Sequence, residues 1–523
     1  MREPYYITTA ISYPNGRPHI GHAYEAIAAD VIARNRKAEG YDVRFQTGTD
    51  EHGLKMMQKA RELGTTPAEL ATEMSGYFRD MCDALNVGYD VFIRTTEERH
   101  HAATQELWRR MEAKGDLYLD RYEGWYSVRD EAYYDESELV AGEDGTKLSP
   151  QGTPVEWTVE ESWFFRLSKY QDKLLELYAS GDFIRPESRR NEIARFVEGG
   201  LRDLSISRTS FDWGVKVPGS DSHVMYVWVD ALTNYLTGLG FPEEGGDYAR
   251  YWPAALHLIG KDIVRFHTVY WPAFLMSADL PLPRQVFGHG FLLNRGQKES
   301  KSLGNVTDPI ALADAFGVDT LRYFFLREVA FGQDGSWSAE AIVTRCNAEL
   351  ANSFGNLAQR SLSMIFKNMG GELKAGLEVS EADGALFTAV SEGIAAMRKS
   401  FDELDFSTGL EAWMRAVFAC NQYVDEQAPW ALRKSDPARM EAVLMTLFRV
   451  VRDLAIALRP VVPQSIDRLL DQMGVASEAR DYDVLGRTDW FETLAASGFV
   501  VDKPQGVFPR LELPEEPAKD PAA

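Results

Sequence analysis

The feature that most constrains this sequence is its opening, where an apolar segment turns tightly into a long helical pattern. Residues 5–11 are rich in aromatic and β-branched side chains, which favours a strand. Pro14-Asn15-Gly16 is a turn signal. Residues 23–39 carry apolar side chains at helical spacing and end at Gly40, a suitable residue to follow a helix. A strand followed closely by a helix is the first unit of a parallel α/β sheet.

The same alternation continues through the first hundred residues. Residues 41–47 predict a second strand. Thr66-Pro67-Ala68-Glu69 is a capping box with proline at the first helical position, so a helix begins there. Another helix is expected from about Thr95 to Gly115.

The pattern then changes. Residues 116–214 hold short aromatic strands, with Trp125, Tyr126, Tyr133 and Tyr134, and predict a small α+β insertion. Strand-like segments return at 224–229, 255–259 and 285–288, so the parallel sheet is expected to resume. From about residue 339 helical patterns dominate, which predicts a helical bundle.

Composition limits the possible partners. The 523 residues include 56 Lys and Arg against 79 Asp and Glu, a formal net charge of −23. This excludes a broad basic face that coats nucleic acid, but not RNA held at a few local sites. No run approaches the ~20 apolar residues of a membrane span, and the amino terminus lacks signal-peptide form. We therefore expect a cytoplasmic protein with no membrane partner.

Two motifs carry the chemistry. His19-Ile20-Gly21-His22 follows the first strand and opens a helix, where backbone N–H groups favour phosphate. Lys298-Glu299-Ser300-Lys301-Ser302 puts two lysines on a loop ahead of Gly304, a cationic clamp of the kind that nucleotidyl transfer needs. Alone, each motif could equally be an ordinary turn with surface histidines or a solvated loop. Together they predict a nucleotide-binding enzyme.

The two motifs resemble the signature pair of the class I aminoacyl-tRNA synthetases, with Glu299 where that family usually has Met. Four longer segments are similar to the methionyl-tRNA synthetase family: GTDEHG at 48–53, YVWVDA at 226–231, IGKDIVRFH at 259–267 and VDEQAPW at 424–430. The resemblance covers roughly residues 4–510. It implies ATP-dependent ligation of L-methionine to tRNA(Met) through a methionyl-adenylate, with release of AMP and pyrophosphate.

The resemblance also implies an architecture of α/β class. A Rossmann-like parallel-sheet catalytic domain at 1–115 and 215–295 would be interrupted by a connective insertion at 116–214. A signature-loop and stem-contact region at 296–338, an α-helical bundle anticodon-binding domain at 339–510 and a disordered tail at 511–523 would follow. The chain shows no obvious added dimerisation domain, so a monomer is expected.

The resemblance further implies roles for single residues. Catalytic roles fall to His19, His22, Lys298 and Lys301. ATP binding falls to His19, Gly21, His22, Glu25, Gly260, Asp262, His289 and Lys301. Methionine binding falls to Ile11, Tyr13, Asp50, Trp228, Ala231, Leu232, Tyr235, Ile263 and His267, with Leu232 where some relatives have proline. Anticodon reading falls to Asn356, Arg360 and Trp430.

The only metal ion that we expect is the one bound to ATP. Mg²⁺ would accompany ATP as substrate rather than occupy a protein cage. Many relatives carry Cys-x-x-Cys zinc knuckles in the insertion, but Cys82, Cys346 and Cys420 all lie outside residues 116–214. A zinc-free insertion is therefore expected.

Two alternatives stay open from the sequence. One is a tRNA-binding paralogue that no longer catalyses, against which the intact His19, His22, Lys298 and Lys301 argue. The other is a cysteinyl- or leucyl-type synthetase. The missing zinc cysteines argue against the first of these types and the short insertion against the second.

Overall fold

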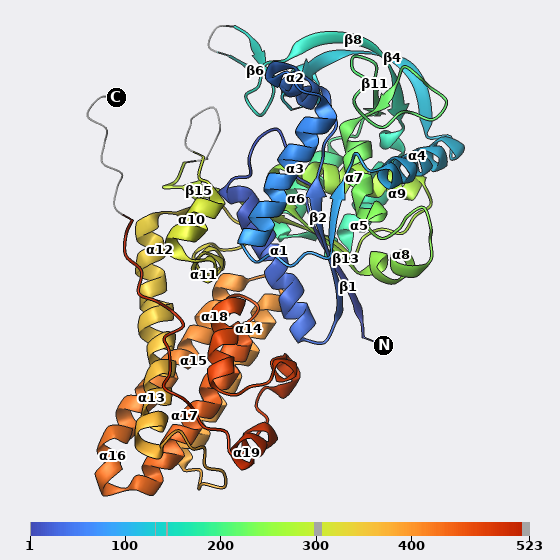
Figure 1. Cartoon of the computed structure of the whole chain (residues 1–523). Helices are drawn as coiled ribbons and strands as arrows, with labels where there is room; N and C mark the ends of the chain where they lie inside the picture. Colours follow the sequence, from blue (N-terminus) through green and yellow to red (C-terminus); the bar gives the residue numbers. More distant parts are fainter. Residues whose placement is uncertain (1, 131, 143–144, 298–305, 515–523) are drawn as a thin grey trace, which may run out of the picture. The chain divides into compact units, whose positions relative to one another are not determined.

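The computed structural model describes residues 2–130, 132–142, 145–297 and 306–514, without the side chains of Tyr122, Ala132 and Glu160. The chain divides into two compact units (Figure 1). We call Pro4–Ala29 with Val43–His289 the sheet unit. We call Met1–Glu3, Asp30–Asp42 and Gly290–Ala523 the helical unit.

The sheet unit is built on a six-stranded sheet in the order β3-β2-β1-β13-β14-β9. The pairs β1–β13, β13–β14, β14–β9 and β2–β3 are parallel, with Tyr6 opposite Ala255 and Leu256 opposite Gln285. The strands are β1 (Pro4–Thr9), β2 (Asp42–Thr49), β3 (Val91–Arg94), β9 (Ile184–Arg185), β13 (Ala255–Gly260) and β14 (Gln285–His289). Together with the C-terminal helices described below, they confirm the predicted fold class.

Helices connect these strands. They are α1 (Ile20–Ala38), α2 (Leu54–Leu63), α3 (Pro67–Ala84), α4 (Glu98–Ala113), α7 (Val227–Thr237), α8 (Gly246–Tyr251) and α9 (Trp271–Ser277). The capping box predicted at Thr66 is present, since Thr66 Oγ1 accepts from Glu69 N–H and the Glu69 carboxylate accepts from Thr66 N–H. The prediction of a strand at residues 224–229 is wrong. Only β12 (Val224–Met225) is strand, because α7 begins at Val227 and packs its apolar residues against α4.

A smaller antiparallel sheet, β10-β8-β4-β5, lies within the range expected for the insertion. Its strands are β4 (Leu117–Ser127), β5 (Ala132–Tyr134), β8 (Glu156–Phe165) and β10 (Leu204–Ser205). Around it lie β6 (Val140–Ala141), β7 (Lys147–Leu148), α5 (Gln171–Ala179), α6 (Glu187–Glu198) and β11 (Ser207–Arg208). β9 comes from the same range but pairs with β14 in the main sheet.

The tip of this insertion is held by polar and aromatic contacts. The Asp130 carboxylate accepts hydrogen bonds from Ser149 Oγ at 2.5 Å and Thr153 Oγ1 at 2.6 Å. Trp125 packs edge-on against Trp157 with ring centroids 5.3 Å apart.

The helical unit begins with a short parallel strand pair and continues as helices. Its elements are β15 (Leu292–Asn294), α10 (Pro309–Phe316), α11 (Val318–Glu328), β16 (Gly335–Trp337), α12 (Ala339–Cys346), α13 (Asn356–Met369), α14 (Glu381–Asp402), α15 (Phe406–Gln427), α16 (Pro429–Ser435), α17 (Pro437–Leu458), α18 (Pro463–Gln472) and α19 (Asp489–Ala496). α14, α15 and α17 pack side by side, and α13 packs on α17 (Figure 1). The helical bundle predicted from about residue 339 is confirmed by α12 to α19.

Buried ions join the elements of this unit. The Arg322 guanidinium on α11 lies 2.5 Å from the Asp30 carboxylate, and both side chains are almost completely buried. Arg322 also donates to the carbonyl of Val461 at 2.8 Å. In the described part of the chain, no helix combines the length and the apolar character needed to cross a membrane.

Candidate active site

The two histidines of the first motif lie together where β1 gives way to α1. Their ring centroids are 3.9 Å apart. Nδ1 of His19 accepts from the Gly21 N–H at 3.1 Å, and Nδ1 of His22 accepts from the His19 N–H at 3.0 Å. In a neutral imidazole whose Nδ1 accepts, Nε2 carries the proton. The local backbone therefore makes each Nε2–H a hydrogen-bond donor, which suits binding to phosphate oxygens.

Glu25 joins two strand ends beside these histidines. One of its carboxylate oxygens accepts from the Ala10 N–H at 3.0 Å, just after β1. The other lies 2.8 Å from Nε2 of His289, the last residue of β14. Predicted ATP-site residues 264 positions apart thus meet at the carboxyl edge of the parallel sheet, where ligands bind in open α/β folds.

The remaining predicted ATP-site residues divide into two groups. Gly260 ends β13, and a Cβ there would lie 2.7 Å from Oδ1 of the exposed Asp262, so glycine lets that carboxylate fold back against the backbone. Lys298 and Lys301 lie outside the described residues.

One wall of the predicted methionine site comes from the loops after β1 and β2. The Ser12 N–H donates to Gly48 O, and the Asp50 N–H donates to Ser12 O, both at 2.9 Å. This pairing places Ile11 and Tyr13 beside Asp50, which is buried. The Tyr13 hydroxyl accepts from the Met56 N–H at 3.0 Å, which holds the ring against the start of α2.

The other wall comes from α7 and the turn after β13. Ala231, Leu232 and Tyr235 are all buried on α7, and Trp228 stacks on Phe266 with centroids 3.8 Å apart. Ile263 ends a short 3₁₀ turn and His267 lies in the π-helical turn Phe266–Tyr270. A π-helical turn widens a helix locally and often occurs at a functional site.

The protonation of His267 follows from its partners. Nδ1 lies 3.0 Å from the Ile263 carbonyl, which can only accept, so Nδ1 carries the proton. Nε2 therefore accepts from the Tyr235 hydroxyl at 2.6 Å. Burial lowers the pKa of His267 to about 4, against a smaller raising effect of the Ile263 carbonyl. The site thus presents a neutral imidazole with aromatic walls, which suits an apolar thioether.

Sequence reasoning missed a buried network behind this wall. The Asp230 carboxylate accepts from His52 Nδ1 at 2.6 Å and from His100 Nε2 at 2.8 Å. Burial alone would raise the pKa of Asp230, but the two histidines lower it below its usual range. His52 and Asp230 stand inside the segments 48–53 and 226–231, so their position in those motifs was the available signal. His100 offered none.

A second missed residue is His257 on β13. Its ring stacks on Tyr235 with centroids 4.1 Å apart, and its Nδ1 lies 2.8 Å from Thr8 Oγ1. Burial and the nearby His267 lower the pKa of His257. The ring supports Tyr235 from the sheet side.

Predicted anticodon residues lie on the helical unit. Ala428 ends α15 in the left-handed conformation (φ 41°), and Pro429 starts α16. This turn leaves Trp430 50% exposed. The Arg360 guanidinium lies 5.4 Å from the Trp430 ring centroid and 3.8 Å from the Asp425 carboxylate. Asn356 lies one turn before Arg360 on α13.

The cysteines do not form a thiolate metal site. Cys82, Cys346 and Cys420 are buried on α3, α12 and α15, and burial raises the pKa of Cys346 and of Cys420. Across residues 2–130, 132–142, 145–297 and 306–514, no group of three or more His, Cys, Asp or Glu side chains could hold a metal ion. The expectation of a zinc-free insertion stays a prediction.

Comparison with known proteins agrees with this geometry. The sequence profile of the family described as tRNA synthetases class I (M) matches residues 5–362. The profile of the anticodon binding domain of methionyl tRNA ligase matches residues 373–516. Methionine--tRNA ligase of Brucella suis is 56% identical over 516 residues, which cover 98% of this chain and 99% of the relative. That of Mycobacterium bovis is 55% identical over 522 residues, covering 98% and 99%.

A solved structure shows the same fold. Mycobacterium tuberculosis methionyl-tRNA synthetase in complex with methionyl-adenylate superposes with a TM-score of 0.93 and 55% identity, covering 97% of this chain and 100% of that one. A Rossmann-like sheet with paired histidines at its carboxyl edge, followed by a helical domain, defines a class I aminoacyl-tRNA synthetase.

Within that class, the chain belongs to the methionyl-tRNA synthetase family. It is a ligase that joins L-methionine to tRNA through methionyl-adenylate, as the sequence predicted. The cysteinyl- and leucyl-type alternatives are thereby set aside.

Proposed function

We propose that His19 and His22 hold the phosphates of ATP while the methionine carboxylate attacks the α-phosphate and pyrophosphate leaves. The observation that carries this proposal is the pair of backbone N–H···Nδ1 bonds, which make both Nε2–H groups donors at the N-terminus of α1. Neutral donors already in place stabilise developing charge without reorganisation. No protein nucleophile is required, because positioning and electrostatics suffice.

The nucleoside part of ATP would lie toward the strand ends. Glu25 and His289 would form the adenine side, Gly21 and Gly260 would allow close approach, and Asp262 would bind the ribose hydroxyls. Mg²⁺ enters as part of the ATP substrate and neutralises its phosphates. Lys298 and Lys301 would complete the clamp around the leaving pyrophosphate.

The methionine side chain would lie between two walls. Ile11 and Tyr13 form one wall, with the Asp50 carboxylate for the substrate ammonium group. The second wall consists of Trp228, Ala231, Leu232, Tyr235, Ile263 and His267. Aromatic rings around a polarizable sulfur give favourable contacts, and a charge-assisted bond from the ammonium group fixes the orientation.

The terminal ribose hydroxyl of tRNA(Met) would then attack the adenylate. We assign recognition of the anticodon to Asn356, Arg360 and Trp430. Trp430 offers an exposed ring on which an unpaired base can stack. We further propose a cytoplasmic monomer without structural zinc. Light scattering and elemental analysis of purified protein test the last two points.

The central experiment is ATP–pyrophosphate exchange driven by each of the twenty amino acids. Only methionine should support exchange, and its failure to do so would favour a non-catalytic tRNA-binding paralogue. Lys301→Ala should lower methionine-driven exchange at least ten-fold with little change in methionine binding. Lys399→Ala, which removes an exposed lysine on α14, is the matched control and should leave exchange unchanged.

A further inference from the structure

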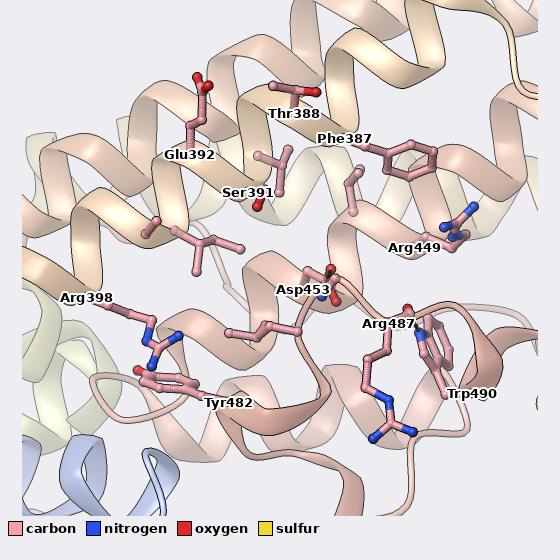
Figure 2. A pocket seen from close by; sticks show the side chains of 16 residues that line it. Phe387, Thr388, Ser391, Glu392, Arg398, Arg449, Asp453, Tyr482, Arg487 and Trp490 are labelled. Carbon is pink, nitrogen blue, oxygen red and sulfur yellow. Dashed lines mark hydrogen bonds between the residues drawn. The ribbon is translucent and has the colours of Figure 1, made fainter.

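The helical unit contains a pocket whose lining includes none of the residues assigned to anticodon reading (Figure 2). Its volume is about 550 Å³, within the range of small-molecule sites. α14 forms one wall, α17 contributes the floor, and residues 482–490 form the opposite wall. The α14 residues Phe387, Ser391, Ala395 and Arg398 repeat at spacings of three and four, so one helical face lines roughly 16 Å of the pocket.

The wall opposite α14 is firmly attached. The Gly486 N–H donates to the Asp453 carboxylate at 3.0 Å, and Arg452 donates to Val484 O at 2.6 Å. Tyr482 is buried, and its hydroxyl donates to Asn35 Oδ1 at 2.8 Å. The pocket is therefore preformed between fixed elements.

Arginines lie at both ends of the pocket, and the lining between them combines apolar side chains with Ser391 and the Asp453 carboxylate (Figure 2). Figure 2 shows Arg398 beside Tyr482 at one end and Arg449 beside Phe387 at the other. The guanidinium carbons lie 4.8 Å and 4.3 Å from the respective ring centroids. Between them the lining includes Val390, Ile394, Val450 and Leu485.

Arg449 lacks the partner that such a group usually finds. Arg449 is half-buried and makes no hydrogen bond or ion pair with any residue in the described part of the chain. Burial lowers its pKa more than Asp453 and Glu492 raise it. Arg398 differs, because its guanidinium lies 3.6 Å from the Glu39 carboxylate, although its buried Nε–H has no hydrogen-bond partner among the described residues.

A bound anion would compensate the charge of Arg449. The surrounding part of the chain is acidic overall, since residues 346–523 contain 18 basic and 27 acidic side chains. A guanidinium matches a phosphate in planar, two-point hydrogen bonds. The apolar side chains of Val390, Ile394, Val450 and Leu485 suit the faces of a flat base. The exposed hydroxyls of Thr388 and Ser391 can bond to a ribose.

We propose that this pocket binds a nucleoside phosphate, with its phosphate on Arg449 and its base against the apolar side chains that lie toward Arg398. The same chemistry is offered by a free nucleotide and by one nucleotide of an RNA strand. The site is separate from the proposed catalytic centre, whose described residues all belong to the sheet unit.

The test uses full-length protein whose catalytic site is saturated with a non-hydrolysable methionyl-adenylate analogue. Uridine 5′-monophosphate is titrated by equilibrium dialysis, since uracil is not the base of the ATP substrate. One equivalent should bind. Arg449→Met should weaken binding at least ten-fold, while Arg415→Met, at an exposed arginine on α15, should leave it unchanged.

A second variant keeps both arginines but fills part of the pocket. Ala395→Trp places a large side chain on the α14 wall, where residue 395 is exposed, and should also abolish binding. Tighter Arg449-dependent binding of a pentauridylate than of the mononucleotide would identify an RNA strand as the source. Equal or weaker binding would identify the free nucleotide. Binding that ignores Arg449→Met or Ala395→Trp, or that inorganic phosphate reproduces in full, would overturn the proposal.

Discussion

The hydroxyl of Tyr235 lies 2.6 Å from Nε2 of His267, and both side chains are buried in the sheet unit. The Ile263 carbonyl holds the proton of His267 on Nδ1, so the Tyr235 hydroxyl is the donor in this pair. In the wall assigned to methionine, these two rings are thus neutral and are held in place by hydrogen bonds. His257 stacks behind Tyr235 and connects the pair to β13.

Tyr235→Phe should weaken methionine binding. The variant keeps the ring but leaves Nε2 of His267 buried without its donor, at a cost of about 1–2 kcal/mol. We expect the methionine KM in ATP–pyrophosphate exchange to rise roughly five- to thirty-fold, with the KM for ATP unchanged. An unchanged methionine KM would remove Tyr235 from the site.

His267 itself should stay neutral across the physiological range. Its pKa of about 4 in the folded protein lies below the ~6.5 of an unfolded chain, so unfolding takes up a proton between these values. His267 therefore lowers the free energy of unfolding as pH falls from about 6.5 to about 4. Histidine NMR should show no titration of this ring between about pH 5.5 and 8. A midpoint near 6.5 would contradict the assigned burial.

His22 offers a test of donor geometry. His22→Gln can place an amide N–H near the position of Nε2, whereas His22→Asn is too short and retains only a group near Nδ1. We expect the Asn variant to lose roughly a hundred-fold in adenylate formation, about 3 kcal/mol, and the Gln variant to lose less. Methionine affinity by calorimetry should change in neither. A smaller loss in the Asn variant than in the Gln variant would mean that His22 acts through Nδ1, by shaping the backbone, and not as a donor to phosphate.

The sequence predicted elements whose signals are local. Thr66 and Glu69 cap α3 through bonds between residues three apart, so the motif and the structure coincide. The strand predicted at residues 224–229 is wrong because the signal of the helix α7 is not local. The residues Val229–Thr237 of α7 are all buried, so no polar face marks the helix, and its β-branched start imitates a strand.

The residues of the candidate site also fall into those that a local motif reveals and those that only the fold brings together. His19 and His22 form one local motif, but Asp230 meets His52 and His100 from 178 and 130 residues away. No spacing rule joins such residues, because only the packing of α4, α7 and the loop after β2 brings them together. Longer motifs marked His52 and Asp230 as part of the family pattern without assigning them a partner.

Trp430→Ala should impair the transfer of methionine to tRNA but not the activation of methionine by ATP. Removing a stacking ring costs about 2 kcal/mol, so kcat/KM for aminoacylation of tRNA(Met) should fall roughly thirty-fold. Methionine-dependent ATP–pyrophosphate exchange should remain unchanged, because it needs no tRNA. Trp157→Ala removes a comparably exposed tryptophan, 53% against 50%, and is the control. A loss in both assays would indicate misfolding rather than RNA recognition.

Asp383 controls the acid stability of the helical unit. It accepts from Arg439 at 2.6 and 2.8 Å, from the Ser380 N–H at 2.9 Å and from the Tyr423 hydroxyl, which joins α14, α15 and α17. Burial would raise the pKa of Asp383, but these donors lower it to about 2, below the ~3.9 of an unfolded chain. The carboxylate therefore contributes stability that is present above about pH 4 and is lost as pH falls toward 2.

Asp383→Asn should lower the free energy of unfolding at pH 7 by about 3 kcal/mol, because Arg439 then lacks its anionic partner. The same variant should show a shallower loss of stability between about pH 4 and 2 than the parent chain. Urea denaturation followed by circular dichroism at several pH values measures both effects. Asp425→Asn removes a carboxylate that is 71% exposed and lies 3.8 Å from Arg360, so it should change neither quantity appreciably. A parallel pH dependence of Asp383→Asn and the parent would mean that Asp383 does not set the acid limit, whatever the loss at pH 7.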